Sequence, residues 1–154
     1  MDADSAVVKE ARRPGTAIAL LILLAGSLLV GFSQGRWLAP LAAWIGPVLI
    51  LRYARDHSTW RGFLLVLLGQ ILAVFLGFGD FFPLPMAAFI VLANAFLMSL
   101  PYLADRLLSP RLPGFSSTLA FPLAATALEF MTIHVNPMGT WGSTGFTQYG
   151  VLPI

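Results

Sequence analysis

The stretch FFPLPMAAFIVLANAFLMSLPYLA, residues 81–104, runs for 24 residues without a charged side chain. A helix needs about 20 apolar residues to cross the hydrocarbon core of a bilayer, so this run is long enough for one span. The whole chain of 154 residues is 58% hydrophobic and only 10% charged. A soluble domain carries about 25% charged residues. We therefore expect a polytopic transmembrane helix bundle of the all-α class.

The other charge-free runs divide the chain into about five spans. Charged residues bound runs at 14–35, 37–51, 62–79 and 112–128, and the last of these continues as an apolar segment beyond Glu129. We expect spans at residues 16–33, 38–51, 62–78, 85–104 and 118–135, which together form a membrane domain over residues 16–135. Residues 1–15 would form an N-terminal tail, and residues 136–154 a loop after the last span.

The second span is shorter than a bilayer is thick. Its 14 residues, 38–51, would extend roughly 21 Å as a helix, against a hydrocarbon core of about 30 Å. Pro40 suits a first helical turn, whereas Pro47 is expected to kink the helix. Arg36 and Arg52 extend its reach because long cationic side chains snorkel to the interface. A short kinked span and a re-entrant segment both fit this segment.

Positive charges favour the crossing span. If all five segments cross and the N-terminus is cytoplasmic, eight of the nine cations lie inside: Lys9, Arg12, Arg13, Arg52, Arg55, Arg61, Arg106 and Arg111. Only Arg36 lies outside, as the positive-inside rule requires. Without the second span this alternation breaks. The arrangement places residues 136–154 outside. The net charge is only +2, and the positions of the cations are better explained by membrane topology than by binding to nucleic acid.

A few polar residues lie inside the expected spans. Glu129 is the one acid well inside a span, where a carboxylate costs about 2.5–3.5 kcal/mol on insertion scales. Glu129 could have a functional role, or it could anchor the helix near its outer end. Thr126 and Thr132 lie three residues away on either side, close enough on a helix to form hydrogen bonds with it. Gln70 and Asn94 are expected to form hydrogen bonds between helices.

Small residues within the span 62–78 indicate how its helix packs. Gly69, Ala73 and Gly77 recur every four residues and predict a stripe that allows two helices to approach closely.

The chain has no cysteine, which excludes disulfides and thiolate metal ligands. His57 and His134 are expected on opposite sides of the membrane. We expect no metal site and no cofactor.

The most distinctive segment follows the last span. Residues 136–150, NPMGTWGSTGFTQYG, contain four glycines, three aromatics and no charge. They fit an outer loop with an interfacial aromatic belt, or an ordered loop that lines a lipid or acyl-chain site. The candidate lipid- or substrate-proximal residues are Glu129, Trp141, Gln148 and Tyr149.

The same region resembles a known family. The segments LAFPLAATALEF (119–130), NP (136–137), GTWGS (139–143) and TQYG (147–150) resemble the membrane region of apolipoprotein N-acyltransferases, and more widely of carbon–nitrogen hydrolase-type membrane proteins. The resemblance implies transfer of an acyl chain from a phospholipid to a lipoprotein's N-terminal amine, at the bacterial cytoplasmic (inner) membrane. It implies a nitrilase-like domain carrying catalytic Cys, Glu and Lys residues, with membrane lipid and lipoprotein as partners.

The departures from the family concern its chemistry. The chain has no cysteine, its single lysine is Lys9 in the tail, and it ends at Ile154, before the family's catalytic domain. No catalytic residue carries over, so we expect a truncated membrane region that is inactive alone. Two alternatives from other classes remain: a small transporter or channel subunit that uses Glu129 as an ion site, and a non-catalytic membrane assembly protein.

Overall fold

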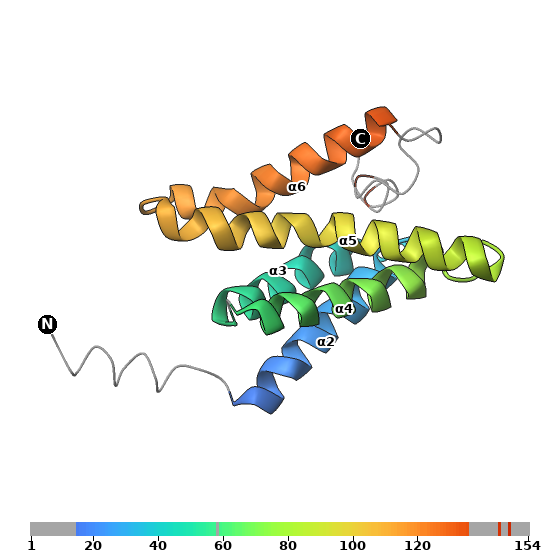
Figure 1. The fold of residues 1–154 in the computed structure, drawn as a ribbon, viewed down its shortest axis with the longest axis horizontal. Coiled ribbons are helices and arrows are strands. Elements are labelled where there is room, and N and C mark those ends of the chain that lie inside the picture. The colour runs from blue at the N-terminus through green and yellow to red at the C-terminus, as the bar shows by residue number, and fades with distance from the viewer. Residues whose placement is uncertain (1–14, 58, 136–144, 146–147, 149–154) are drawn as a thin grey trace, which may run out of the picture.

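The computed structural model describes residues 15–57, 59–135, 145 and 148, and its architecture is shown in Figure 1. Within these residues the secondary structure is entirely helical, which confirms the predicted all-α class. The elements are α2 (Thr16–Phe32), α3 (Pro40–Asp56), α4 (Trp60–Phe78), α5 (Leu84–Leu108), the short 3-10 helix η1 (Ser109–Arg111) and α6 (Ser116–Val135). Each expected span overlaps one α-helix, although α3 and α5 extend beyond the expected ends.

Three helical segments are long and apolar enough to cross a membrane: Trp60–Phe78, Leu84–Arg111 and Ser116–Val135. Helix α2 is apolar but has only 17 residues. Helix α3 also has 17 residues, rather than the expected 14, because it continues past its last apolar residue to Asp56. These features indicate integration into a membrane, and the number of helices that cross stays a prediction.

The two prolines of α3 occupy the expected positions in the helix. Pro40 occupies the first turn, where its missing N–H would have no partner in any case, and Pro47 lies within the helix. The 17 residues of α3 extend roughly 26 Å. This length is closer to a bilayer core than the charge-free run alone indicates.

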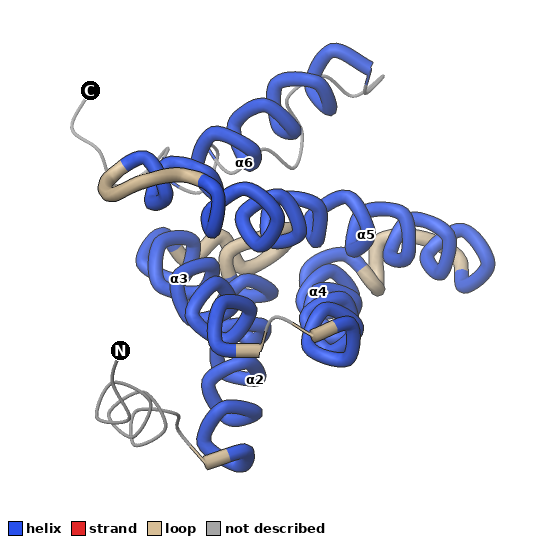
Figure 2. Tube along the Cα trace, turned by 60° about the vertical axis from the view of Figure 1, so that its left-hand side comes forward, coloured by secondary structure: helices blue, strands red, loops and turns tan. Residues whose placement is uncertain are grey.

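Helix α2 lies between α3 and α4, α5 packs on α4, and α6 packs on α5 (Figures 1 and 2). The α4 stripe faces α2 and the turn that follows it: a Cβ at Gly69 would overlap the Ser27 hydroxyl of α2, and one at Gly77 would lie 3.3 Å from the Gln34 Cβ in the turn. Ala73, between them, has no exposed surface. The predicted small-residue stripe is therefore confirmed as a close helix contact.

The contact between α2 and α3 is also made by glycine. A Cβ at Gly26 would lie 2.8 Å from Cγ1 of Ile50, and a Cβ at Gly46 would lie 2.8 Å from Cγ2 of Val30. Such spacing lets the backbones come together, and in a membrane this van der Waals packing replaces the hydrophobic effect as the force between helices. Ile50 is consequently fully buried.

Helix α6 is peripheral. Of its residues only Ala120 is buried, whereas Leu123, Phe130 and Met131 are 64–65% exposed. Figures 1 and 2 both show α6 meeting α5 near η1 and separating from it toward Val135. A helix so apolar and so exposed suits a lipid environment better than water.

Candidate functional site

The charged side chains gather at two opposite ends of the bundle. We call one the arginine-rich end: it comprises the C-terminal turns of α3 and α5, the start of α4, and η1. At the other end Arg36 and Asp80 form an ion pair, with 2.8 Å between Nη1 and Oδ2. Because both side chains are substantially exposed, this pair contributes little to stability.

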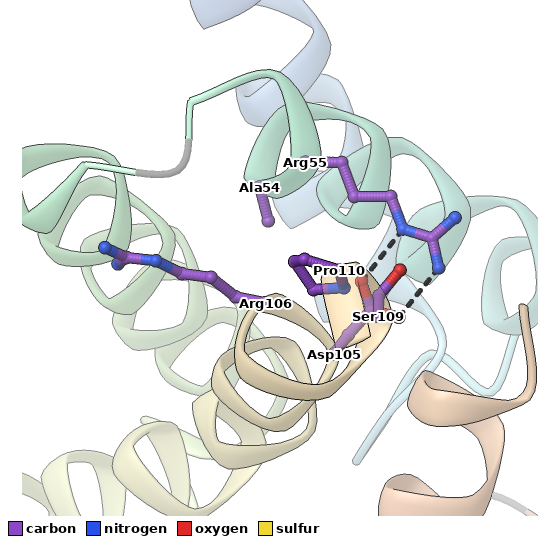
Figure 3. Close-up of a pocket in the computed structure, with 6 residues that line it drawn as sticks. All are labelled: Ala54, Arg55, Asp105, Arg106, Ser109 and Pro110. Carbon is purple, nitrogen blue, oxygen red and sulfur yellow. Dashed lines mark hydrogen bonds and ion pairs between the residues drawn. The ribbon is translucent and has the colours of Figure 1, made fainter. Parts of the chain in front are cut away.

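An ion pair between Arg55 and Asp105 organises the arginine-rich end (Figure 3). The Arg55 Nε donates to Oδ2 at 2.8 Å, and its Nη2 donates to Oδ1 at 2.7 Å. Such bidentate arginine–carboxylate pairs are among the strongest charge-assisted hydrogen-bonded interactions in proteins. Nη2 also donates to the Ser117 carbonyl at 3.3 Å, so the guanidinium joins α3, α5 and α6.

The environments of the two partners differ. Asp105 is 1% exposed, whereas the Arg55 side chain retains 39% of its surface. The hydrogen bond from Arg55 to Asp105 raises the pKa of the guanidinium above its ordinary value, which keeps it charged at any physiological pH. Arg55 therefore neutralises the buried Asp105 carboxylate while part of its own side chain remains in contact with solvent.

Sequence reasoning missed Asp105, because it was treated as the charge that ends the run 81–104. A signal was available: the buried face of α5 includes Ala95, Ser99 and Tyr102, and steps of three or four residues continue it to Asp105. Extending the helical period past the first charge would have placed this aspartate on the buried face.

A pocket of about 240 Å³ opens beside the pair and is lined by Ala54, Arg55, Asp105, Arg106, Ser109 and Pro110 (Figure 3). Arg106 lies on the opposite side of the pocket from the Arg55 guanidinium. Its Nη1 donates to the backbone carbonyl of Thr59 at 3.2 Å. Thr59 also caps α4, since its hydroxyl accepts the Gly62 N–H. The α5 arginine is thereby anchored to the start of α4.

The polar residues within the spans behave in two ways. Gln70 is 1% exposed and lies beside the Tyr102 side chain of α5, so its position is compatible with the expected bond between helices. Its Oε1 has no partner among the described residues. For Asn94 the expectation is wrong: its Nδ2 donates to the Ile90 carbonyl of its own helix at 2.9 Å. This local acceptor lies one turn away on the same helix.

The residues predicted to lie near lipid or substrate are partly described. Glu129 is half-buried on α6, and the neighbouring Thr132 hydroxyl donates to the Leu128 carbonyl at 2.8 Å. Gln148 Nε2 donates to the Pro40 carbonyl at 3.3 Å, at the end of the bundle opposite the arginine-rich end. The remaining two, Trp141 and Tyr149, lie outside the described residues.

Among the described residues, no three His, Asp or Glu side chains are grouped to hold a metal ion. A scan against protein-family models, a search of curated proteins and a search of solved structures each find no match for the chain. The resemblance over residues 119–150 accordingly stays a prediction.

Proposed function

We propose that this chain is an integral membrane module that crosses the bilayer five times with a cytoplasmic N-terminus. The observation that carries this is the segregation of charge along the helix axes. Five of the six described arginines lie at the arginine-rich end, and Arg36 alone lies at the other. Successive helices that run up and down through a bilayer produce this distribution when their inner ends are positive.

We further propose that the module is the N-terminal transmembrane part of an acyltransferase of the apolipoprotein N-acyltransferase type and supplies no catalytic residue itself. The likeness of residues 119–150 to that family supports this. The contact of Gln148 with the start of α3 fits a loop at the outer end, where such an enzyme meets its lipoprotein. The exposed α6 fits a helix whose remaining neighbours are lipid or further helices.

Topology can be tested directly because the chain contains no cysteine. Single cysteines would replace Ser5, Phe81, Leu112 and Ser143, and intact cells would be treated with a membrane-impermeant maleimide. We expect labelling at positions 81 and 143 in intact cells, and at positions 5 and 112 only after lysis. If α3 is re-entrant, positions 5 and 81 share the inner side and position 112 is labelled from outside, which contradicts the proposal.

The acyltransferase assignment has a separate test. The DNA that follows codon 154, and the neighbouring genes, should encode a nitrilase-like domain with Glu, Lys and Cys in its active site. Co-expression of that domain with this chain should give N-acylated lipoprotein by mass spectrometry, and neither part alone should. If no such domain is encoded nearby, the assignment fails.

A transporter function would be visible in reconstituted vesicles. Proton or cation flux that the wild-type chain supports and the Glu129→Gln variant loses would contradict the proposal. We expect no such flux from the chain alone.

A further inference from the structure

The arginine-rich end carries more positive charge than its own acids balance. Five arginines lie there: Arg52, Arg55, Arg61, Arg106 and Arg111. Among the described residues, the acids of the same end are Asp56 and Asp105, and Asp105 is already paired with Arg55. Within the described part of the chain, no carboxylate oxygen lies within 4 Å of Arg106. Its one recorded acceptor is the neutral Thr59 carbonyl.

Two arginines line the pocket, and their side chains extend in opposite directions from it. In Figure 3 Arg106 flanks it on one side and Arg55 on the other, with Ala54 and Pro110 between them. Its volume of about 240 Å³ is enough for a phosphate group, since a water molecule takes about 30 Å³. Because Asp105 is bound by Arg55, Arg106 is the one charged residue in the pocket lining without a carboxylate partner among the described residues.

The length of α5 places this pocket at the membrane surface. Its 25 residues extend roughly 37 Å, whereas the hydrocarbon core is about 30 Å thick. If the helix enters the core near Leu84, its last turn, with Asp105 and Arg106, extends into the headgroup layer. Basic pockets between membrane helices at this depth bind anionic headgroups.

We propose that the pocket binds the phosphodiester of an anionic phospholipid, with Arg106 as its main ligand and Arg55 on the opposite wall. This inference rests on the membrane integration put forward above. A free phosphate ester offers the same chemistry, but the position at the end of apolar helices favours a lipid, whose acyl chains would lie along them. The site is distinct from the outer loop with which the acyltransferase likeness is concerned.

Native mass spectrometry of the delipidated chain in detergent tests the site, with phosphatidylglycerol and phosphatidylcholine as probes. The wild-type chain should retain phosphatidylglycerol in preference. Arg106→Gln should lower that preference about fivefold, or ~1 kcal/mol, because the pocket loses its main ligand for the phosphodiester. Arg111→Gln, the matched control, removes the same charge from an exposed residue that does not line the pocket, and it should keep the preference.

A second variant tests the pocket without changing any charge. Ser109→Trp would fill the volume and should abolish the preference while it leaves the melting temperature near that of the wild type. Equal losses in Arg106→Gln and Arg111→Gln, or full binding by Ser109→Trp, would overturn the proposal. Displacement of the lipid by glycerol phosphate at comparable concentration would also overturn it, in favour of a soluble phosphate ester.

Failure of this inference can be told apart from failure of the proposed function. Alkaline carbonate extraction that releases the chain from membranes would refute membrane integration and with it both proposals. Retention in the membrane with equal affinity for the two lipids would refute the headgroup site alone.

Discussion

Removal of the Arg55 guanidinium should destabilise the bundle more than removal of the Asp105 charge, although the two groups share one ion pair. The reason lies in their unequal burial: 1% of Asp105 is exposed, against 39% of the Arg55 side chain. In Arg55→Gln a buried carboxylate loses both of its charge-assisted hydrogen bonds. In Asp105→Asn the arginine that remains can turn toward water or headgroups.

The magnitudes follow from this asymmetry. Removing one partner of a buried pair typically costs about 3–5 kcal/mol, because the other charge stays buried without compensation. We expect Arg55→Gln to fall in that range. For Asp105→Asn we expect about 1–2 kcal/mol, since Arg55 is partly solvated and the amide oxygen still accepts one hydrogen bond. The double variant should be more stable than Arg55→Gln alone.

Thermal unfolding in detergent, followed by the fluorescence of the four tryptophans, measures these effects. A chain of this size shifts its melting temperature by roughly 2–4 °C per kcal/mol. Arg55→Gln should therefore melt about 10 °C below the wild type, and Asp105→Asn only a few degrees below. Equal shifts, or a larger shift for Asp105→Asn, would refute the argument from burial. So would a double variant no more stable than Arg55→Gln.

Two further predictions concern the helix contacts. Gly69→Ala should destabilise the protein by about 1–3 kcal/mol, because the new Cβ overlaps the Ser27 hydroxyl, which must leave its hydrogen bond to the Leu23 carbonyl unless the helices move apart. Gly15→Ala, where nothing lies within 4 Å, is its control in the same melting assay, and equal effects would remove steric overlap as the cause. Gln70→Leu should change stability by less than about 1 kcal/mol, because loss of the polar contact with Tyr102 is offset by removal of a buried oxygen that has no partner among the described residues. A loss above 3 kcal/mol in chemical denaturation would show that Gln70 has a further essential partner.

Much of the helical layout was readable from the positions of charged residues. Each uncharged run became one helix, because a long apolar segment in a bilayer must satisfy its own backbone hydrogen bonds. The glycine stripe from Gly69 to Gly77 was also found correctly, since small residues every four positions share one helix face. The end of α3 was missed by five residues, because a charge interrupts hydropathy without interrupting a helix.

The partners in the ion pairs could not be predicted from the sequence pattern. Arg55 is adjacent in sequence to Asp56, yet it pairs with Asp105 fifty residues away. Arg36 likewise meets Asp80 from another connection. Periodicity assigns a residue to a face of its own helix, but the crossing and rotation of two helices decide which faces meet. Asn94 shows the converse, since a local carbonyl replaced the expected partner on another helix.

The amino-acid order thus determined how many helices form and at which end each charge lies, because those properties depend on single segments and their solvent. Only the tertiary structure brought Arg55, Asp105 and Arg106 around one pocket, because that arrangement depends on the packing of α3, α4 and α5 together.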